Sequence, residues 1–232
     1  MGQKRGRIII SQLTGGTIVN IYETVSGAQS KEKYIYLGLD ESGNARMLRY
    51  YAAEAKRMND TAVASYSGCE ADVWLEDTST GFLSRFDSSI IGLLRNTSIS
   101  YTDWTIDPGG AVTLVTISRR CFLLSYTEEG FNATTAGSEG QSYLPALKAL
   151  YLSEHPDGQT AVDNQIRIGY NLSGSAVRVW MRSGYNTSYF RMVNDGGNAS
   201  EFRPNNANWL RPALSVTPNA EVKEINGEYY LE

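Results

Sequence analysis

Strand-like segments separated by glycine and asparagine turns fill both ends of the chain, and they restrict the fold to one rich in antiparallel sheet. The segment 7–25 predicts a hairpin with its turn at Gly15-Gly16, and the segment 33–52 predicts a second hairpin that turns at 41–44. Gly and Asn tolerate the positive φ angles that tight turns need. Four further strand-like segments lie in the last third, at 165–172, 176–183, 188–195 and 209–216.

Between these regions the spacing of apolar residues changes to three or four. This spacing predicts two short helices, over 70–80 and 87–95, and Asp87-Ser88 is a typical N-cap for the second. A third helix is predicted within 142–154, where Pro145 falls in the first turn and its missing amide is tolerated. Strands are predicted again at 98–106 and 111–126, on either side of a turn at 108–110. The order sheet, helices, sheet, helix, sheet favours an α+β fold with antiparallel strands.

The chain has 232 residues, enough for one large domain or two small ones with a sizeable core. Its 21 basic and 25 acidic residues give a net charge of −4, and the basic residues are scattered, so we expect no nucleic-acid partner. The apolar runs are too short to cross a bilayer, and no apolar signal core follows the basic start. We therefore expect neither membrane insertion nor export by a standard signal.

Few residues are available for metal or nucleophilic chemistry. His155 is the single histidine, and Cys69 and Cys121 are far apart in the sequence, so a tetrahedral zinc site lacks ligands and free buried thiols are expected. Asn194-Asp195, beside two glycines, is the candidate for calcium, but it has too few carboxylates for a dedicated loop. His155 lies in a polar turn where a solvated side chain is the ordinary state, and no Gly-x-Ser-x-Gly elbow occurs. We expect neither a cofactor nor catalysis.

Several segments occur in an order that is informative as a set. WMRS at 180–183, NDGG at 194–197 and LRPAL at 210–214 follow RCFLLSYTE at 120–128 and the helical segment that contains Trp74. Together they cover about residues 65–217. They resemble the signature of a domain family of unassigned function that is common in phages and in gut bacteria.

The resemblance implies a C-type-lectin-like fold, which is a display scaffold rather than a chemistry. It places this domain at 61–232, with residues 1–60 as N-terminal hairpins that dock it or complete its sheet within one continuous unit. The chain departs from the family pattern at the displayed surface: Trp180 is single where relatives have a pair, and no proline follows Arg182-Ser183. These departures leave the identity of any ligand open.

The resemblance also separates supporting residues from recognition residues. The residues expected to support the sheet, with both arginines hydrogen-bonded to loop carbonyls, are Trp180, Arg182, Arg211 and Pro212. Aromatic faces and amide groups suit the recognition of a glycan or a protein. The candidate ligand-binding residues of this kind are Tyr185, Asn186, Tyr189, Arg203, Asn205, Asn206, Asn208 and Trp209. The alternative, in which the asparagines serve turn geometry by capping local backbone, stays open.

The expected function is that of a non-enzymatic bacteriophage virion protein, displayed on the particle surface as a head decoration, a fibre or a tail-associated protein that adheres to host glycan. Its expected partners are other virion proteins and further copies of itself, because repetition gives adhesins avidity. Assembly in the host cytoplasm needs no signal sequence. One alternative is an enzyme of the formylglycine-generating or glycosidase class, with which acid pairs such as Glu70 and Asp72 are compatible. Another is a purely structural component without a ligand.

Overall fold

The structure is a computed structural model of the chain, and it describes residues 8–106, 112–132, 137–156, 160 and 162–232. Of the described residues, 42% are in β structure and 17% in helices. The expected α+β, C-type-lectin-like fold is therefore wrong, and the fold is mostly β. The physical reason is that the predicted helices over 70–80 and 87–95 shrink to seven and six residues.

The larger of two main sheets has eight strands. In spatial order they are β1 (Ile8–Ile9), β16 (Glu221–Ile225), β17 (Glu228–Leu231), β2 (Ile18–Val25), β3 (Ala28–Leu39), β4 (Ala45–Arg49), β15 (Pro212–Val216) and β8 (Cys121–Leu123). The two ends of the chain meet in this sheet, because β17 pairs in parallel with β2. Residues 8–60 therefore share sheets and one hydrophobic core with the rest of the described chain.

The first hairpin turns at Ser26-Gly27 rather than at Gly15-Gly16. Ser26 and Gly27 have φ angles of 52° and 80°, the positive pair that a two-residue turn needs between antiparallel strands. Gly16 also has a positive φ, but its role is close packing against helix α3 (Leu144–Glu154). A Cβ on Gly16 would lie 2.7 Å from the carbonyl oxygen of Ala146. The glycine pattern predicted a turn there and did not distinguish a hairpin from a close approach.

The smaller main sheet has five strands, in the order β13 (Ala199–Phe202), β12 (Tyr189–Val193), β11 (Val179–Asn186), β14 (Ala207–Leu210) and β5 (Glu54–Arg57). The chain crosses between the two sheets at residues 50–53, from β4 to β5, and at Arg211, from β14 to β15. Because β4 pairs with β15 and β5 pairs with β14, the two crossings lie side by side. We call residues 50–53 together with Arg211 the seam.

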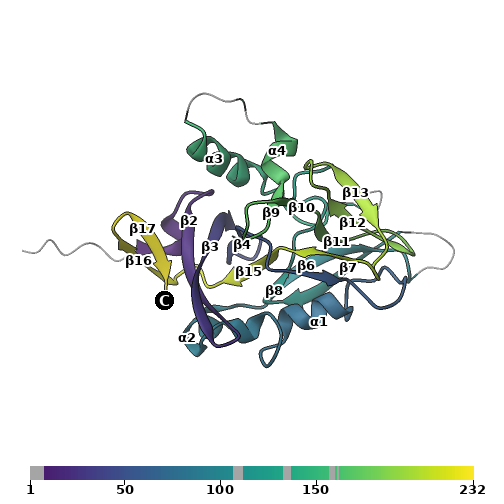
Figure 1. Cartoon of the computed structure of the whole chain (residues 1–232), viewed down its shortest axis with the longest axis horizontal. Helices are drawn as coiled ribbons and strands as arrows, with labels where there is room; N and C mark the ends of the chain where they lie inside the picture. The colour runs from purple at the N-terminus through teal and green to yellow at the C-terminus, as the bar shows by residue number, and fades with distance from the viewer. Residues whose placement is uncertain (1–7, 107–111, 133–136, 157–159, 161) are drawn as a thin grey trace, which may run out of the picture.

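Two hairpins and several short helices complete the described fold. Their bounds are β6 (Thr97–Asp103), β7 (Thr113–Arg119), β9 (Gly169–Tyr170), β10 (Ala176–Val177), η1 (Ile10–Gln12), η2 (Leu83–Arg85), α1 (Glu70–Glu76), α2 (Ser88–Leu93) and α4 (Asp163–Arg167). Helices α3 and α4 lie on one side of the sheets, and α1 and α2 lie on the other (Figure 1). The segment 165–172, predicted as a strand, begins instead within α4. The turn predicted at 108–110 lies outside the described residues.

Local chemistry explains where the helices begin. The Asp87 carboxylate accepts hydrogen bonds from the amides of Ser89 and Ile90 and so caps α2 as the sequence predicts. Cys69 caps α1 through its sulfur, which is an unusual cap that the sequence did not indicate. Cys69 and Cys121 are both buried and free, as expected. Among the described residues, no helix is long and apolar enough to cross a membrane.

Candidate functional site

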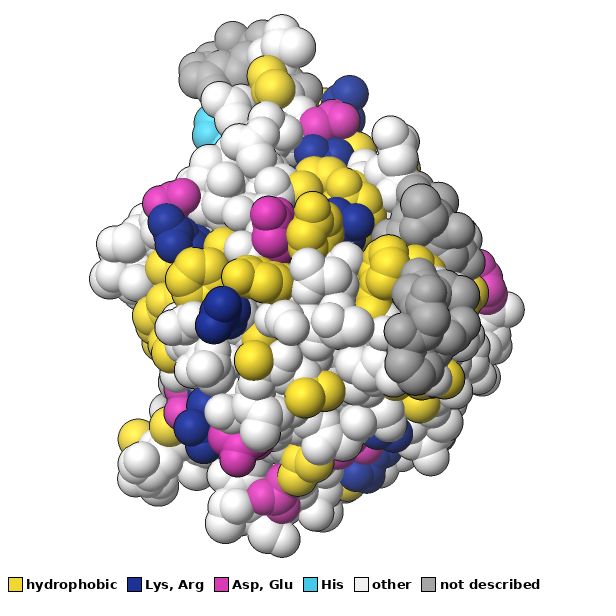
Figure 2. Space-filling model, turned by 90° about the vertical axis from the view of Figure 1, so that its right-hand side faces the viewer, with side chains coloured by type: hydrophobic (Ala, Val, Ile, Leu, Met, Phe, Trp, Pro, Cys, Tyr) yellow, Lys and Arg dark blue, Asp and Glu magenta, His cyan; other side chains and the backbone are white. Residues whose placement is uncertain are grey.

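The predicted recognition residues lie around β11, β12 and the turn between β13 and β14. Tyr185 is exposed, and the Arg191 guanidinium lies between its ring and that of Tyr126. The Tyr189 hydroxyl accepts a hydrogen bond of 3.2 Å from Arg203 Nε. Charged side chains of both signs are interspersed over this side of the molecule (Figure 2). The surface therefore has the mixed polar character of an ordinary sheet face.

The four predicted asparagines do not act together. The Asn186 side chain accepts from the Ser188 amide and so serves its own turn. Asn205 and Asn206 are exposed in the turn between β13 and β14. Asn208 is buried, and its Nδ2 has no hydrogen-bond partner among the described residues.

The next residue, Trp209, packs on Ala52, Val177 and Val179. Because side chains alternate along a strand, Asn208 and Trp209 point to opposite faces of the sheet. None of the eight predicted residues lines either of the two cavities described below. Tyr189 and Arg203 are in contact, but Asn208 and Trp209 point to opposite faces, so the eight do not share one face of the sheet.

Two predicted supporting residues lie deep in the interior. Trp180 is 1% exposed, and its indole nitrogen donates to the Lys56 carbonyl. Arg182 is fully buried and donates to the carbonyls of Ser100, Leu123 and Glu139 at 2.7–2.9 Å.

Arg182 also forms an ion pair with Glu128 at 2.5 Å. Burial alone would lower the pKa of Arg182, but Glu128 and Glu139 raise it above its ordinary value. Each nitrogen of the Arg182 guanidinium thus has a protein partner.

Arg211 was grouped with Arg182 by sequence, but its surroundings differ. It lies on the seam, 6% exposed, immediately before Pro212, whose ring cannot donate to the sheet. Its Nε donates to the Arg49 carbonyl at 3.0 Å, and its buried Nη1 has no partner among the described residues. No carboxylate of the described residues forms an ion pair with it.

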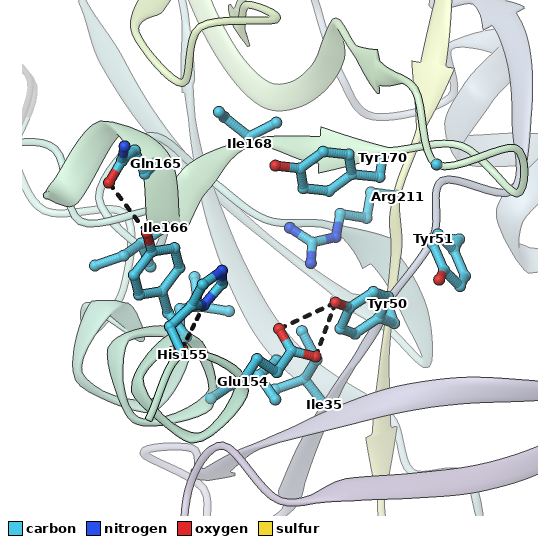
Figure 3. A pocket seen from close by; sticks show the side chains of 14 residues that line it. Ile35, Tyr50, Tyr51, Glu154, His155, Gln165, Ile166, Ile168, Tyr170 and Arg211 are labelled. Atoms are coloured by element: carbon cyan, nitrogen blue, oxygen red, sulfur yellow. Dashed lines mark hydrogen bonds between the residues drawn. The ribbon is translucent and has the colours of Figure 1, made fainter. Parts of the chain in front are cut away.

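A cavity of about 410 Å³ opens beside this guanidinium. It lies between the seam and helices α3 and α4, with β9 along one wall (Figure 3). Its lining residues are Ile35, Tyr50, Tyr51, Leu147, Leu150, Tyr151, Glu154, His155, Gln165, Ile166, Ile168, Tyr170, Gly174 and Arg211. We call it the tyrosine pocket.

Aromatic groups hold one another in place around the tyrosine pocket. The rings of Tyr50 and Tyr51 pack edge to face with centroids 4.8 Å apart, and His155 stacks on Tyr151 at 4.2 Å. The Tyr50 hydroxyl donates to the Glu154 carboxylate at 2.9 Å. Burial and that hydrogen bond raise the pKa of Tyr50, so its hydroxyl stays a donor at neutral pH.

The Arg211 side chain extends between the rings of Tyr50 and Tyr170, towards α3 (Figure 3). Burial lowers the pKa of Arg211, and the nearby Glu129 opposes that effect only in part. Burial likewise raises the pKa of Glu129 to about 7, against the attraction of Arg211 and Arg167. Glu129 Oε2 is buried and has no hydrogen-bond partner among the described residues. Glu129 therefore offsets the burial of the Arg211 charge only in part.

The sequence did not predict most of the residues that line this pocket. His155 was expected to be a solvated turn residue, but it caps α3 and lies in the pocket lining. The adjacent Tyr50 and Tyr51 are the one local signal, and among 15 tyrosines a pair does not stand out. Only Arg211 was singled out from sequence, and for a supporting role.

A second cavity, of about 330 Å³, contains the buried Arg46. Arg46 Nε and Nη1 have no partner, but its Nη2 forms an ion pair with Asp40 at 3.1 Å. Glu41, Glu128 and Glu139 also line this cavity, so its charge is predominantly negative. It lacks the unmatched positive charge that distinguishes the tyrosine pocket.

Comparison with known proteins gives one match. A family model described as a domain of unknown function (DUF6273) matches residues 42–218, a range that contains every lining residue of the tyrosine pocket except Ile35. No curated protein sequence and no solved structure matches the chain.

Proposed function

The chain belongs to the DUF6273 family of domains of unknown function, and from that premise we propose that it is a non-enzymatic recognition module displayed on a bacteriophage particle. In this proposal the tyrosine pocket binds an anionic group on the host surface. Other virion proteins and further copies of the chain hold the module on the particle.

The observation that carries the proposal is the unmatched guanidinium of Arg211. An unpaired buried charge costs several kcal/mol, on the order of a large part of a domain's stability. Arg211 Nη1 has no partner among the described residues, and the side chain lines a cavity of about 410 Å³ between Tyr50 and Tyr170. Cavities of this size hold small ligands in other proteins. An anionic ligand would remove the cost of the unpaired charge. Without a ligand, the unpaired charge contributes nothing to the stability of the scaffold.

The chemistry of the lining supports binding over catalysis. The hydrolysis of glycosides ordinarily uses two carboxyl groups across the scissile bond, and Glu154 is the single acid among the pocket's lining residues. Neither Cys69 nor Cys121 lines the pocket. Burial raises the pKa of Cys69 to about 12 and that of Cys121 well above its usual value, so neither provides a thiolate at neutral pH.

The phage setting rests on sequence resemblance. WMRS at 180–183, NDGG at 194–197 and LRPAL at 210–214 are the segments that carry it. A protein repeated on a particle gains avidity, so a weak pocket suffices for adhesion.

Two measurements test the proposal. Mass spectrometry of purified particles should detect the chain, and the fluorescently labelled full chain should bind host cells. Gln165→Trp should abolish cell binding, because exposed Gln165 lies at the pocket and a bulky ring there blocks it. Gln29→Trp, at an exposed strand position far from the pocket lining, is the matched control. Particles without the chain, or equal cell binding by both variants, would refute the proposal.

A further inference from the structure

The charges around the tyrosine pocket limit the ligand to one negative charge. Arg211 is the one arginine or lysine, and Glu154 the one carboxylic acid, among the lining residues. A single carboxylate that reaches the Arg211 guanidinium from the cavity forms a charge-assisted hydrogen bond and neutralises it. A dianion such as a phosphate monoester adds a charge that Arg211 cannot balance and that Glu154 repels.

The walls of the pocket suit a flat ring. Tyr50, Tyr51 and Tyr170 line the pocket, and the Arg211 guanidinium emerges between Tyr50 and Tyr170 (Figure 3). An aromatic face packs well against either an aromatic ring or the apolar face of a sugar ring. A ligand whose carboxylate is attached to a six-membered ring can therefore use the guanidinium and the tyrosines together.

Two polar side chains of the lining favour a ring that carries hydroxyl groups. Glu154 is exposed and accepts from the Tyr50 hydroxyl, which leaves carboxylate lone pairs for further donors. The exposed Gln165, which accepts from the Tyr151 hydroxyl, adds amide donors. The ring of a simple aromatic acid has no hydroxyl groups that could hydrogen-bond to Glu154 and Gln165. Sugar hydroxyls can both donate to and accept from these side chains.

We infer that the tyrosine pocket is a binding site for an acidic sugar, in which the ring carboxylate binds Arg211 and the ring hydroxyls meet Glu154 and Gln165. This inference rests on the proposed function and names the chemical class of its ligand. It goes beyond the proposed function because an aromatic acid or a phosphate, each of them anionic, would serve that function equally well.

Isothermal titration calorimetry of the full chain with three probes tests the inference. Glucuronate should bind more tightly than glucose by roughly tenfold to a hundredfold, since the two share a ring and differ by one carboxylate. Benzoate, which has the carboxylate without the hydroxyls, should bind more weakly than glucuronate. Glucose equal to glucuronate, benzoate tighter than glucuronate, or no binding of glucuronate would each overturn the inference.

Variants locate the site. Arg211→Met should reduce glucuronate affinity to that of glucose, and Arg178→Met, at an exposed arginine outside the pocket lining, should leave it unchanged. If Arg211→Met does not fold, Gln165→Trp tests the same pocket without touching Arg211. Equal losses in Arg211→Met and Arg178→Met would overturn the assignment.

The failure of this inference differs from failure of the proposed function. Host-cell binding that is lost in Gln165→Trp, together with no glucuronate binding, rejects the acidic sugar and keeps the recognition module. Host-cell binding that is unchanged in Gln165→Trp rejects the recognition module itself.

Discussion

Arg182 and Arg211 are both buried arginines that sequence assigned to the same supporting role, and the structure gives them opposite surroundings. Arg182 donates to three carbonyls and pairs with Glu128. Arg211 donates to one carbonyl and leaves Nη1 unpartnered beside a cavity of about 410 Å³. The pKa of Arg182 is raised by its acidic neighbours, whereas burial lowers that of Arg211.

Burial of a charged side chain therefore does not by itself identify its role. A buried charged group that hydrogen-bonds to several protein groups is part of the scaffold, because its removal leaves those groups buried without partners. A buried charge with open bonds beside a cavity is a candidate binding group, because the missing partner can come from solution. This comparison predicts that loss of Arg182 affects stability and that loss of Arg211 affects binding.

The largest expected effect is that of Arg182→Met. The substitution leaves Glu128 as an uncompensated buried charge and three carbonyls without their donor, so the free energy of unfolding should fall by about 3–5 kcal/mol. Urea denaturation of the purified chain measures this loss. A loss below about 1 kcal/mol would break the comparison, since Arg182 would then not be a scaffold residue.

A somewhat smaller change in stability is expected with pH. Its source is Glu129, the acid that interacts most strongly with the charge of Arg211. Burial raises the Glu129 pKa from 4.5 to about 7, so the folded protein holds a proton that the unfolded chain releases between these values. The proton bound to folded Glu129 stabilises the protein fully below pH 4.5, and this contribution is lost as the pH rises to 7. The free energy of unfolding should fall by about 3 kcal/mol over this range.

Urea denaturation of the wild type and of Glu129→Gln between pH 4.5 and 8 sharpens the comparison. The neutral amide cannot ionise, so the variant should lack the wild-type fall in stability between pH 4.5 and 7. An identical pH profile for both proteins would show that Glu129 is already ionised, and that Arg211 has a counter-charge after all.

Arg211→Met should change the free energy of unfolding by no more than about 1 kcal/mol in either direction. One hydrogen bond to the Arg49 carbonyl is lost, and the cost of an unpaired buried charge is removed with it. The same urea experiment provides the value. A loss as large as that of Arg182→Met would mean that both arginines are scaffold residues.

The smallest effect is expected on the surface that sequence selected for recognition. Arg203 is exposed, and its contacts are one hydrogen bond to the Tyr189 hydroxyl and a position over the Tyr189 ring. Arg203→Ala should cost less than about 0.5 kcal/mol and leave glucuronate binding unchanged. Loss of binding in this variant would move the site from the tyrosine pocket to β12 and β13.

Short sequence patterns predicted local structure such as helix caps. They could not predict the contacts between segments that are distant in the sequence. The cap at Asp87 and the helix after Pro145 follow from neighbouring residues, and both occur. The seam does not, because it needs the pairing of β4 with β15 and of β5 with β14, more than 150 residues apart. Arg211 was found through a sequence motif, but its position between Tyr50 and Tyr170 depends on segments that no sequence spacing connects to it.

The central claim is that Arg211 is a binding arginine and Arg182 a scaffold arginine. Nitrogen-15 NMR of the arginine side chains during a glucuronate titration of the full chain tests it most directly, because both Nε–H groups are observed in one spectrum. The account predicts a saturable shift of the Arg211 signal and an unchanged Arg182 signal. An unmoved Arg211 signal, or equal shifts of both, would contradict it.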